Sequence, residues 1–201
     1  MSRESRKFHV PDELANLYDF ANTLDLRKFV HHGVRHEQAE ELATPSALGA
    51  WMRERGLGEH GPPPSQKQFE NALRLRQSIR DYLRCDPAER PRKQGVIDTL
   101  NKAMEPFSLR VAGLGKAGMK LVAAQSGTTP GLSAIVAELY DGAVNGSLNR
   151  LKMCAAEECQ RVFYDRSKPA TRRWCQSTLC GNREKTRTYR ERYKAHASSD
   201  G

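Results

Sequence analysis

Two pairs of cysteines constrain the fold of this chain more than any other feature. Four residues separate Cys154 from Cys159 and Cys175 from Cys180, and fifteen residues lie between the two pairs. Each pair can place two thiolates on one metal ion, and the segment between the pairs can fold back to complete a tetrahedron. The spacing therefore predicts one structural zinc ion bound by all four thiolates. The alternative is a set of four unrelated buried or redox-active cysteines.

The residues around the cysteines predict a small module over 150–196. Short strands are expected at Leu151–Met153 and Gln160–Tyr164, on either side of a tight knuckle. No helix breaker occurs from Glu184 to Lys194, so the fourth cysteine should lie at the start of a helix, where amide dipoles favour a thiolate. So small a module has too few apolar residues to fold alone, and we expect zinc to supply the missing stability.

Positive charge is concentrated in the same module. The chain has a net charge of +9, of which residues 150–196 carry +8 and residues 1–149 only +2, with Asp200 in the remaining tail. So much basic charge on so few residues indicates a polyanionic partner, and DNA is the partner we expect. The alternative is a surface that only improves solubility.

The last helix gathers basic side chains on one face, at helical spacing: Arg183, Arg187, Arg190 and Lys194. The complete set of candidate nucleic-acid contacts is Arg172, Arg173, Arg183, Lys185, Arg187, Arg190, Arg192 and Lys194. Arg183 and Arg187 lie nearest the helix start and are the candidates for reading a base, with a structural role that braces the knuckle beside the metal as the alternative for Arg183. We expect Tyr189 and Tyr193, four residues apart, to pack down onto the protein. The alternative is a solvated helix in which Glu184 and Glu191 pair with the bases.

Residues 1–149 predict an α-rich domain that contains one β-hairpin. Helices are expected after Pro11-Asp12 with Leu24 on the apolar face, after the Thr44-Pro45 cap, after the capping-box pair Ser65 and Gln68, over Val96–Met104, and from Thr129-Pro130 to Arg150. The apolar side of the last of these helices includes Leu132, Ile135, Val136, Leu139, Tyr140, Ala143 and Leu148. Alternating apolar residues over 107–111 and 119–123 predict the hairpin. No flexible linker precedes the cysteine module, so the two parts should be held semi-rigidly.

Two weaker patterns point to ligand sites, and each has a simpler explanation. Gly113–Gly118 matches the glycine pattern of dinucleotide-binding loops, but strand-like residues follow it, and a glycine-rich hairpin turn explains it better. His31, His32 and His36 form the one histidine cluster. It could bind a metal if Val30–Glu41 were helical, but a surface cluster is the simpler interpretation.

Polar residues also interrupt the apolar face of the first helix, and one cysteine lies outside the two pairs. For Asp19, Asn22 and Thr23 we expect buried hydrogen bonds to the backbone, with a ligand pocket as the alternative. Cys85 should be an ordinary thiol at a helix end.

The stretch from Cys154 to Tyr193 resembles the CGNR zinc finger, which is named for the tetrapeptide Cys180-Gly181-Asn182-Arg183 of this sequence. The resemblance extends to Phe163, Asp165, Arg172, Arg173, Trp174, Arg190 and Arg192. Upstream, Leu17–Arg27 and Leu48–Leu57 resemble, more loosely, the ABATE domain, which usually precedes this finger and is described as a stress-induced transcription regulator. The resemblance implies a bacterial cytoplasmic protein with a zinc-stabilised DNA-binding end.

The residues and the resemblance lead to one hypothesis. We expect an α+β, mostly helical protein: an α-rich domain with a β-hairpin over 1–149, then a small treble-clef-like zinc finger over 150–196. Its function would be DNA-binding transcription regulation, with a homodimer and a small-molecule effector as further partners. The alternative is a zinc adaptor that binds RNA or protein.

Three other classes of protein are not expected. No Ser/His/Asp or Cys/His arrangement for nucleophilic catalysis can be argued, so we expect no enzyme. Apolar runs such as Leu121–Ala124 are too short to span a membrane. No apolar stretch follows the N-terminal basic residues, so a cytoplasmic protein is expected rather than a secreted one.

Overall fold

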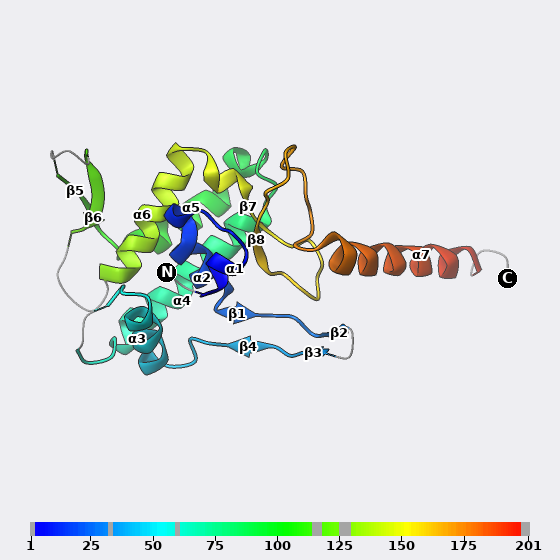
Figure 1. The fold of residues 1–201 in the computed structure, drawn as a ribbon, viewed down its shortest axis with the longest axis horizontal. Coiled ribbons are helices and arrows are strands. Elements are labelled where there is room, and N and C mark those ends of the chain that lie inside the picture. The colour runs from blue at the N-terminus through cyan, green and yellow to red at the C-terminus, as the bar shows by residue number, and fades with distance from the viewer. Residues whose placement is uncertain (1–2, 32–33, 59–60, 114–117, 125–129, 198–201) are drawn as a thin grey trace.

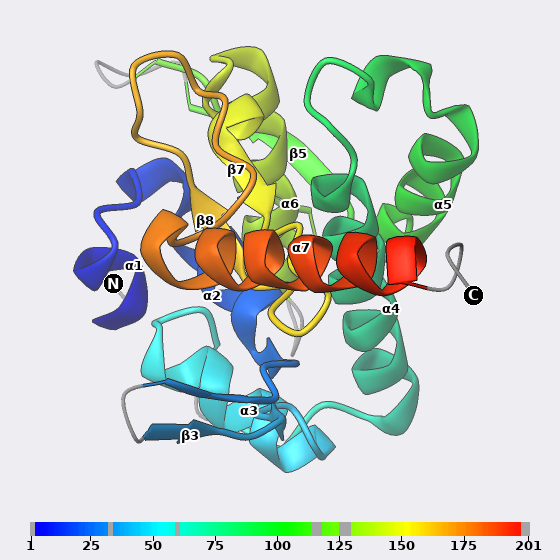
Figure 2. The same cartoon turned by 90° about the vertical axis from the view of Figure 1, so that its right-hand side faces the viewer.

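The computed structural model of the chain describes residues 3–31, 34–58, 61–113, 118–124 and 130–197. Figure 1 shows a body made mainly of helices, with a β-hairpin at one end and the last helix, α7 (Asn182–Ala197), projecting from the other. Figure 2 looks onto that second end, with α7 in front of the body. The predicted α+β, mostly helical class is confirmed.

The helices of the body surround one hydrophobic core. They are α1 (Arg3–Lys7), η1 (Asp12–Leu14), α2 (Ala15–Asn22), α3 (Pro45–Glu54), α4 (Gln66–Arg84), η2 (Arg90–Arg92), α5 (Gln94–Met104), α6 (Pro130–Val144) and η3 (Ser147–Arg150). α2 packs against both α4 and α6. Fully buried side chains come from all three of these helices: Leu17, Phe20, Leu75, Ile79, Leu132 and Ile135. Burial of these apolar faces is the main stabilising contribution to the body.

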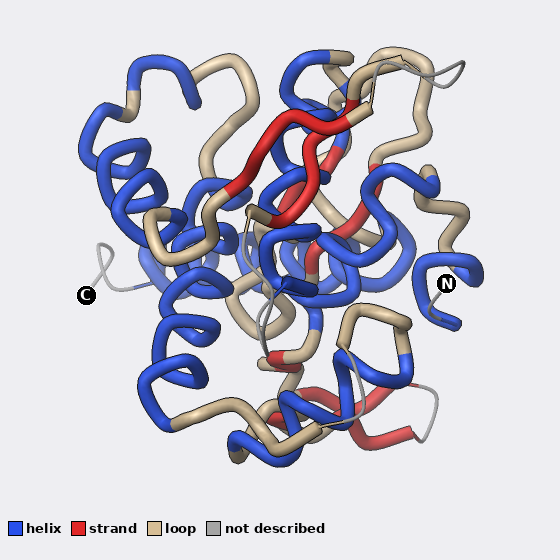
Figure 3. The backbone as a smooth tube through the Cα atoms, turned by 90° about the vertical axis from the view of Figure 1, so that its left-hand side faces the viewer, coloured by secondary structure: helices blue, strands red, loops and turns tan. Residues whose placement is uncertain are grey.

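The strands of the described residues form four separate antiparallel ribbons of two strands each, drawn in red in Figure 3. The pairs are β1 (Leu24–Asp25) with β4 (Ala39–Glu40), β2 (Phe29–His31) with β3 (Val34–His36), β5 (Leu109–Ala112) with β6 (Lys120–Ala123), and β7 (Leu151–Met153) with β8 (Val162–Tyr164). The first two ribbons follow one another along a single arm of chain, which runs from the body toward the base of α7 (Figure 1). The β5–β6 ribbon confirms the predicted hairpin.

Side-chain caps define the starts of two helices as the sequence predicts. The Thr44 side chain accepts a hydrogen bond from the Ala47 amide, 3.1 Å away, with Pro45 in the first turn of α3. Ser65 and Gln68 form a reciprocal capping box at the start of α4. These bonds satisfy amides that have no partner inside the helix.

Two expectations about helices are wrong. The helix after Pro11-Asp12 ends at Asn22, and Leu24 begins a strand instead of continuing the apolar face. The described residues of Val30–Glu41 include the pairs of the β2–β3 and β1–β4 ribbons, so the helix that a metal site at His32 and His36 would require is not formed. The last helix of the body does not run on to Arg150: α6 ends at Val144, and Gly146 has a positive φ of 80°, which breaks the helix.

The side chains at the end of α6 also differ from expectation. Tyr140 is 54% exposed and Ala143 is exposed, although both were expected on the apolar side of this helix. They face solvent because no element of the described chain covers the outer side of α6 there. The residues of the Gly113–Gly118 loop at 114–117, Thr129 and His32 lie outside the described residues. Among the described residues, no helix has the length and apolar character needed to cross a membrane.

Candidate metal centre and nucleic-acid interface

The two cysteine pairs converge on one point. The four Sγ atoms of Cys154, Cys159, Cys175 and Cys180 all lie within 4.8 Å of one another. The Sγ atom of Cys175 lies 3.7 Å from those of both Cys159 and Cys180. Four sulfurs at about 2.3 Å from a tetrahedral zinc ion are separated by roughly 3.8 Å. The geometry therefore fits one zinc ion, as the spacing predicts.

Hydrogen bonds of the backbone shape the knuckle that carries the first pair. Cys154 directly follows β7, and its amide donates to the Arg161 carbonyl across the ribbon at 2.9 Å. The Cys159 amide donates to the Ala156 carbonyl at 2.9 Å, which closes the tight turn. Gln160 then takes a positive φ of 48°, and the chain enters β8. The predicted strands around a knuckle are thus present.

The second pair lies at the entrance to α7. Cys180 belongs to a single π-helical turn, Ser177–Gly181, which leads directly into the helix. Its thiolate is therefore close to the unpaired amides of a helix start, where negative charge is favoured. This position of the fourth cysteine agrees with the sequence prediction.

The four thiols perturb one another strongly. Hydrogen bonds from the three neighbouring thiols lower the pKa of Cys154. Cys175 and Cys180 donate hydrogen bonds to the Cys154 thiolate, and because a donor must keep its proton, these bonds raise the pKa of Cys175 and Cys180. Four thiols this close cannot all ionise unless a cation balances their charge, and a divalent ion that prefers sulfur ligands does so. The chemistry of the donor set therefore also fits zinc.

A small apolar cluster surrounds the cysteines, and part of it comes from the N-terminal domain. Phe29 of β2 is 8% exposed and packs with Phe163 and Ala156 around the cysteine sulfurs. The guanidinium of Arg183 lies 4.3 Å from the centre of the Phe29 ring. The role of Phe29 is not evident from the sequence, because nothing in the pattern of residues 24–41 distinguishes it from a residue of a surface loop.

A buried ion pair supports the loop between the two cysteine pairs. The Lys152 ammonium lies 2.9 Å from a carboxylate oxygen of Asp165, which is fully buried. Asp165 also accepts hydrogen bonds from the Ser167 hydroxyl and the Arg172 amide, at 2.6 and 2.8 Å. Burial alone would raise the pKa of Asp165, but the hydrogen bonds from Ser167 and Lys152 lower it to about 2. Asp165 thus remains charged and fixes the path of the loop that leads to Cys175.

Two buried arginines of the body bind the module through backbone carbonyls. Arg80 of α4 donates to the Ala21 carbonyl at 2.7 Å and to the Gln160 carbonyl in the knuckle at 3.1 Å. Burial lowers the pKa of Arg80 to about 10, so it remains charged at neutral pH. Arg90 donates to the carbonyls of Leu148 and Leu151, at 2.9 and 2.7 Å. Charged donors of this kind satisfy buried carbonyls that would otherwise be unpaired.

Apolar packing and a polar side chain also cross the junction near residue 150. Leu151, Met153 and Val162 of the β7–β8 ribbon are buried in the core of the body. The Asn22 side chain accepts from the Val162 amide and donates to the Val162 carbonyl, each at 3.0 Å. This ribbon is therefore packed as part of the body, while the cysteines and α7 extend beyond it.

Thr23 and Cys85 occupy the kinds of position that the sequence predicts, whereas the hydrogen bond that Asp19 accepts comes from a side chain. Thr23 donates to the Phe20 carbonyl at 2.7 Å, and Asp19 accepts from the Ser5 hydroxyl at 3.3 Å. Cys85 caps the end of α4 and is half-buried. Burial raises the pKa of Asp19 to about 6, because Arg55, at 4.0 Å, only partly compensates for the lost solvation.

The basic residues nearest the start of α7 are engaged with acidic side chains. Arg183 pairs with Glu158 of the knuckle. Arg187 pairs with Glu157 of the knuckle at 2.8 Å and with Glu184 at 2.8 Å. The pairs with Glu157 and Glu158 join the helix to the knuckle, and all three pairs reduce the charge that Arg183 and Arg187 offer to a ligand.

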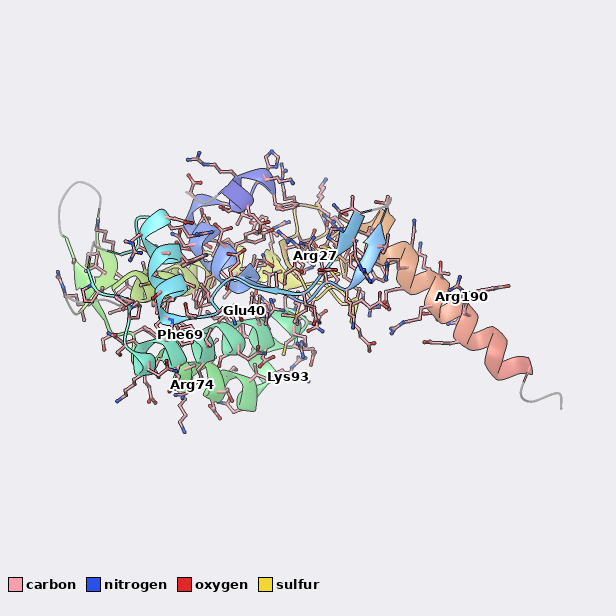
Figure 4. The ribbon with its side chains drawn as sticks, turned by 90° about the horizontal axis from the view of Figure 1, so that it is seen from below. Arg27, Glu40, Phe69, Arg74, Lys93 and Arg190 are labelled. Atoms are coloured by element: carbon pink, nitrogen blue, oxygen red, sulfur yellow. The ribbon has the colours of Figure 1, made fainter. Side chains whose placement is uncertain are left out.

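Farther along α7 the basic residues are exposed. Lys185, Arg190 and Arg192 have no ion pair with any described residue, and Figure 4 shows Arg190 on the projecting part of the helix. Tyr189 is 70% exposed, so the expectation that it packs down is wrong, because α7 leaves the body at this point. The side chains of Lys194 and Tyr193 lie outside the described residues.

The two arginines before the second cysteine pair differ from one another. Arg172 is half-buried, donates to the Cys175 carbonyl, and stacks 5.5 Å from the centre of the Phe163 ring. Arg173 is exposed and lies 5.5 Å from the centre of the Trp174 ring. Of these two, Arg173 has the more accessible charge.

Comparison with known protein families gives two matches. Residues 150–193 match the CGNR zinc finger. Residues 16–156 match the family named ABATE, whose description is "Putative stress-induced transcription regulator". A search of curated proteins finds no match to the chain. The chain therefore belongs to the ABATE family, and it ends in a CGNR zinc finger whose four cysteines can hold one zinc ion.

Proposed function

We propose that the protein is a cytoplasmic transcription regulator that binds duplex DNA through α7, with zinc holding the base of that helix in place. The observation that carries the proposal is the exposure of α7. Every described side chain from Lys185 to Arg192 is exposed, and the helix projects beyond the body in Figures 1 and 4. The helix is polar on all sides, so its exposed side chains are free to contact a ligand.

The charge of α7 supports a polyanionic ligand. Lys185, Arg190 and Arg192 carry positive charge that no described acidic group neutralises. The diameter of a single helix suits the major groove of DNA, where basic side chains reach the phosphates of both strands. The family description, a regulator of transcription, is consistent with this ligand.

The zinc site supports the proposal because bound zinc would hold the base of α7 rigidly. Cys180 precedes α7 directly, and Arg183 and Arg187 fasten the first turns of the helix to the knuckle. Zinc bound by these cysteines would fix the direction in which α7 leaves the body. A helix held in this way loses less conformational entropy on binding DNA than a free one.

We also propose that two copies of the chain act together, in response to a small molecule. One helix contacts few base pairs, and a homodimer would place two copies of α7 on half-sites about one helical turn apart. Three buried polar atoms of α2, α3 and the residue that ends α3 have no hydrogen-bond partner among the described residues: Asp19 Oδ1, Trp51 Nε1 and Arg55 Nε, the last of which lies 4.0 Å from Asp19 Oδ2. A small polar effector would find hydrogen-bonding groups there.

A salt titration of the zinc-loaded protein against duplex DNA tests the proposal. Each phosphate contact lowers the slope of log K against log[salt] by about 0.9, so four contacts give a slope between about −3 and −4. Lys185→Gln and Arg192→Gln should each make the slope less steep by about one unit. Arg110→Gln is the matched control, because Arg110 is an exposed cation on β5, at the far end of the body from α7.

Two results would contradict the proposal. One is the absence of DNA binding at low salt by protein that contains zinc and retains its helices. The other is tighter binding to structured RNA than to duplex DNA, which would favour the RNA adaptor instead.

A further inference from the structure

We infer that α7 contacts DNA bases through the edge that carries Thr186 and Tyr189. In this arrangement Arg183 and Arg187 anchor the helix to the knuckle and do not contact bases. The inference rests on the proposed function, since it assigns roles within the same DNA-binding helix. It differs from the expectation of the sequence analysis, in which Arg183 and Arg187 read the bases.

The acidic residues of α7 lie along a single edge. Successive residues of an α-helix are about 100° apart around its axis. Glu184 and Glu191 are seven residues apart, and thus lie on one edge to within about 20°. Thr186 and Tyr189 lie roughly 140° to 200° around the axis from these glutamates, on the opposite edge.

The basic residues occupy the two flanks between these edges. One flank carries Arg183, Arg187 and Arg190. The other flank carries Lys185 and Arg192, roughly 180° away from the first. The helix therefore has positive charge on both sides, negative charge on one edge, and a hydroxyl group and an aromatic ring on the opposite edge.

This arrangement is complementary to the major groove. The walls of the groove are lines of phosphates, and its floor consists of base edges. A helix that enters with its glutamates outward keeps negative charge away from the phosphates and brings Arg190 to one wall and Lys185 and Arg192 to the other. The edge with Thr186 and Tyr189 then faces the floor.

The exposure and ion pairs of individual side chains agree with this orientation. Tyr189 is 70% exposed, so its ring is accessible to a partner. Arg183 and Arg187 are held by Glu158 and Glu157, so they are fixed on a flank near the body. Thr186 and Tyr189 are about 4.5 Å apart along the axis, enough to reach neighbouring base pairs, which are spaced by about 3.4 Å.

The hydroxyl, methyl and ring groups of these residues suit base recognition. A threonine offers a methyl group to the thymine methyl and an oxygen to amino donors. A tyrosine offers a hydroxyl that donates and accepts, on a ring with few rotatable bonds. Neither side chain carries charge, so neither should affect the dependence of binding on salt.

The test uses the full-length zinc-loaded protein and selection of bound sequences from a random duplex library. The variants are Tyr189→Ala and Thr186→Ala. Thr188→Ala is the matched control, because Thr188 is exposed as Thr186 is. The hydroxyl of each threonine donates to the backbone carbonyl four residues earlier, at 3.0 Å for Thr188 and 2.9 Å for Thr186. Thr188 lies on the other side of the helix. Alanine preserves helical structure in all three variants.

The inference predicts that Tyr189→Ala and Thr186→Ala each lose preference at one or two positions of the selected sequence, by roughly 5- to 100-fold. Their salt slopes, and the sequence selected by Thr188→Ala, should match those of the wild type. The inference is overturned if both variants select the wild-type sequence, or if the wild type binds DNA without any sequence preference. In the first case the proposed function still stands; in the second, DNA binding stands but regulation at specific sites does not. If the wild-type protein binds no DNA, the proposed function fails and the inference fails with it.

Discussion

Replacing Phe29 with alanine should destabilise the metal centre, although Phe29 belongs to the N-terminal domain. Its side chain is 8% exposed and packs around the cysteine sulfurs. Removing a buried phenylalanine costs about 3–5 kcal/mol, and the Arg183 guanidinium at 4.3 Å from the ring adds about 0.5–1 kcal/mol. The cluster is small and can partly collapse, so we expect the metal centre to lose about 3 kcal/mol of stability.

Transfer of zinc to a strong chelator measures this loss. If zinc leaves after the cluster opens, 3 kcal/mol corresponds to a release that is about 100-fold faster. Val30→Ala is the matched control, because Val30 is the next residue of the same strand, on its other face, and is 60% exposed. Exposed positions of this kind change stability by less than about 0.5 kcal/mol. Equal rates of zinc release from Phe29→Ala and Val30→Ala would refute the role assigned to Phe29.

Three further predictions concern the metal, pH and the junction. Elemental analysis should find one zinc per chain, and far less in Cys180→Ser; one zinc per chain in a protein that lacks both Cys175 and Cys180 would contradict the assignment. Burial raises the pKa of Glu138 to about 7, against its ordinary value of about 4.3. The folded protein therefore favours the protonated carboxyl: the stabilisation that this gives is complete below about pH 4 and is lost as pH rises through 7. Glu138→Gln should therefore lose less unfolding free energy than the wild type between pH 5.5 and 8, by about 2 kcal/mol in denaturant titrations; identical pH profiles would exclude this role. Limited trypsin digestion should find no preferred site between residues 145 and 153, because Arg90 binds the carbonyls of Leu148 and Leu151; rapid cleavage there would show that the junction is loose.

The local features that the sequence predicts correctly depend on residues close together in the chain. The cysteine pairs, the capping box at Ser65 and Gln68, and the β5–β6 hairpin each require only a few neighbouring residues. Helix caps, tight turns and metal knuckles are determined at this scale. Such features can therefore be predicted from the sequence alone.

The features that the sequence does not reveal depend on long-range contacts. In the sequence, Arg80 resembles an ordinary surface residue of an amphipathic helix. It is nevertheless 1% exposed, because its guanidinium lies between α4 and the knuckle and donates to the Gln160 carbonyl. Phe29 lies on a ribbon too short to show alternation, and its partners are more than a hundred residues away. The pairing of Arg183 and Arg187 with Glu158 and Glu157 likewise requires the three-dimensional position of the knuckle.

Crosslinking of the full-length protein to DNA in its own cells, followed by genome-wide sequencing, tests the central claim most directly. A DNA-binding regulator should give discrete peaks upstream of genes, and these peaks should share a sequence. The double variant Lys185→Gln, Arg192→Gln should retain zinc but lose the peaks, since it lacks two exposed cations of α7. Signal spread evenly over the genome, or peaks that persist in this variant, would contradict the claim that the protein regulates transcription through α7.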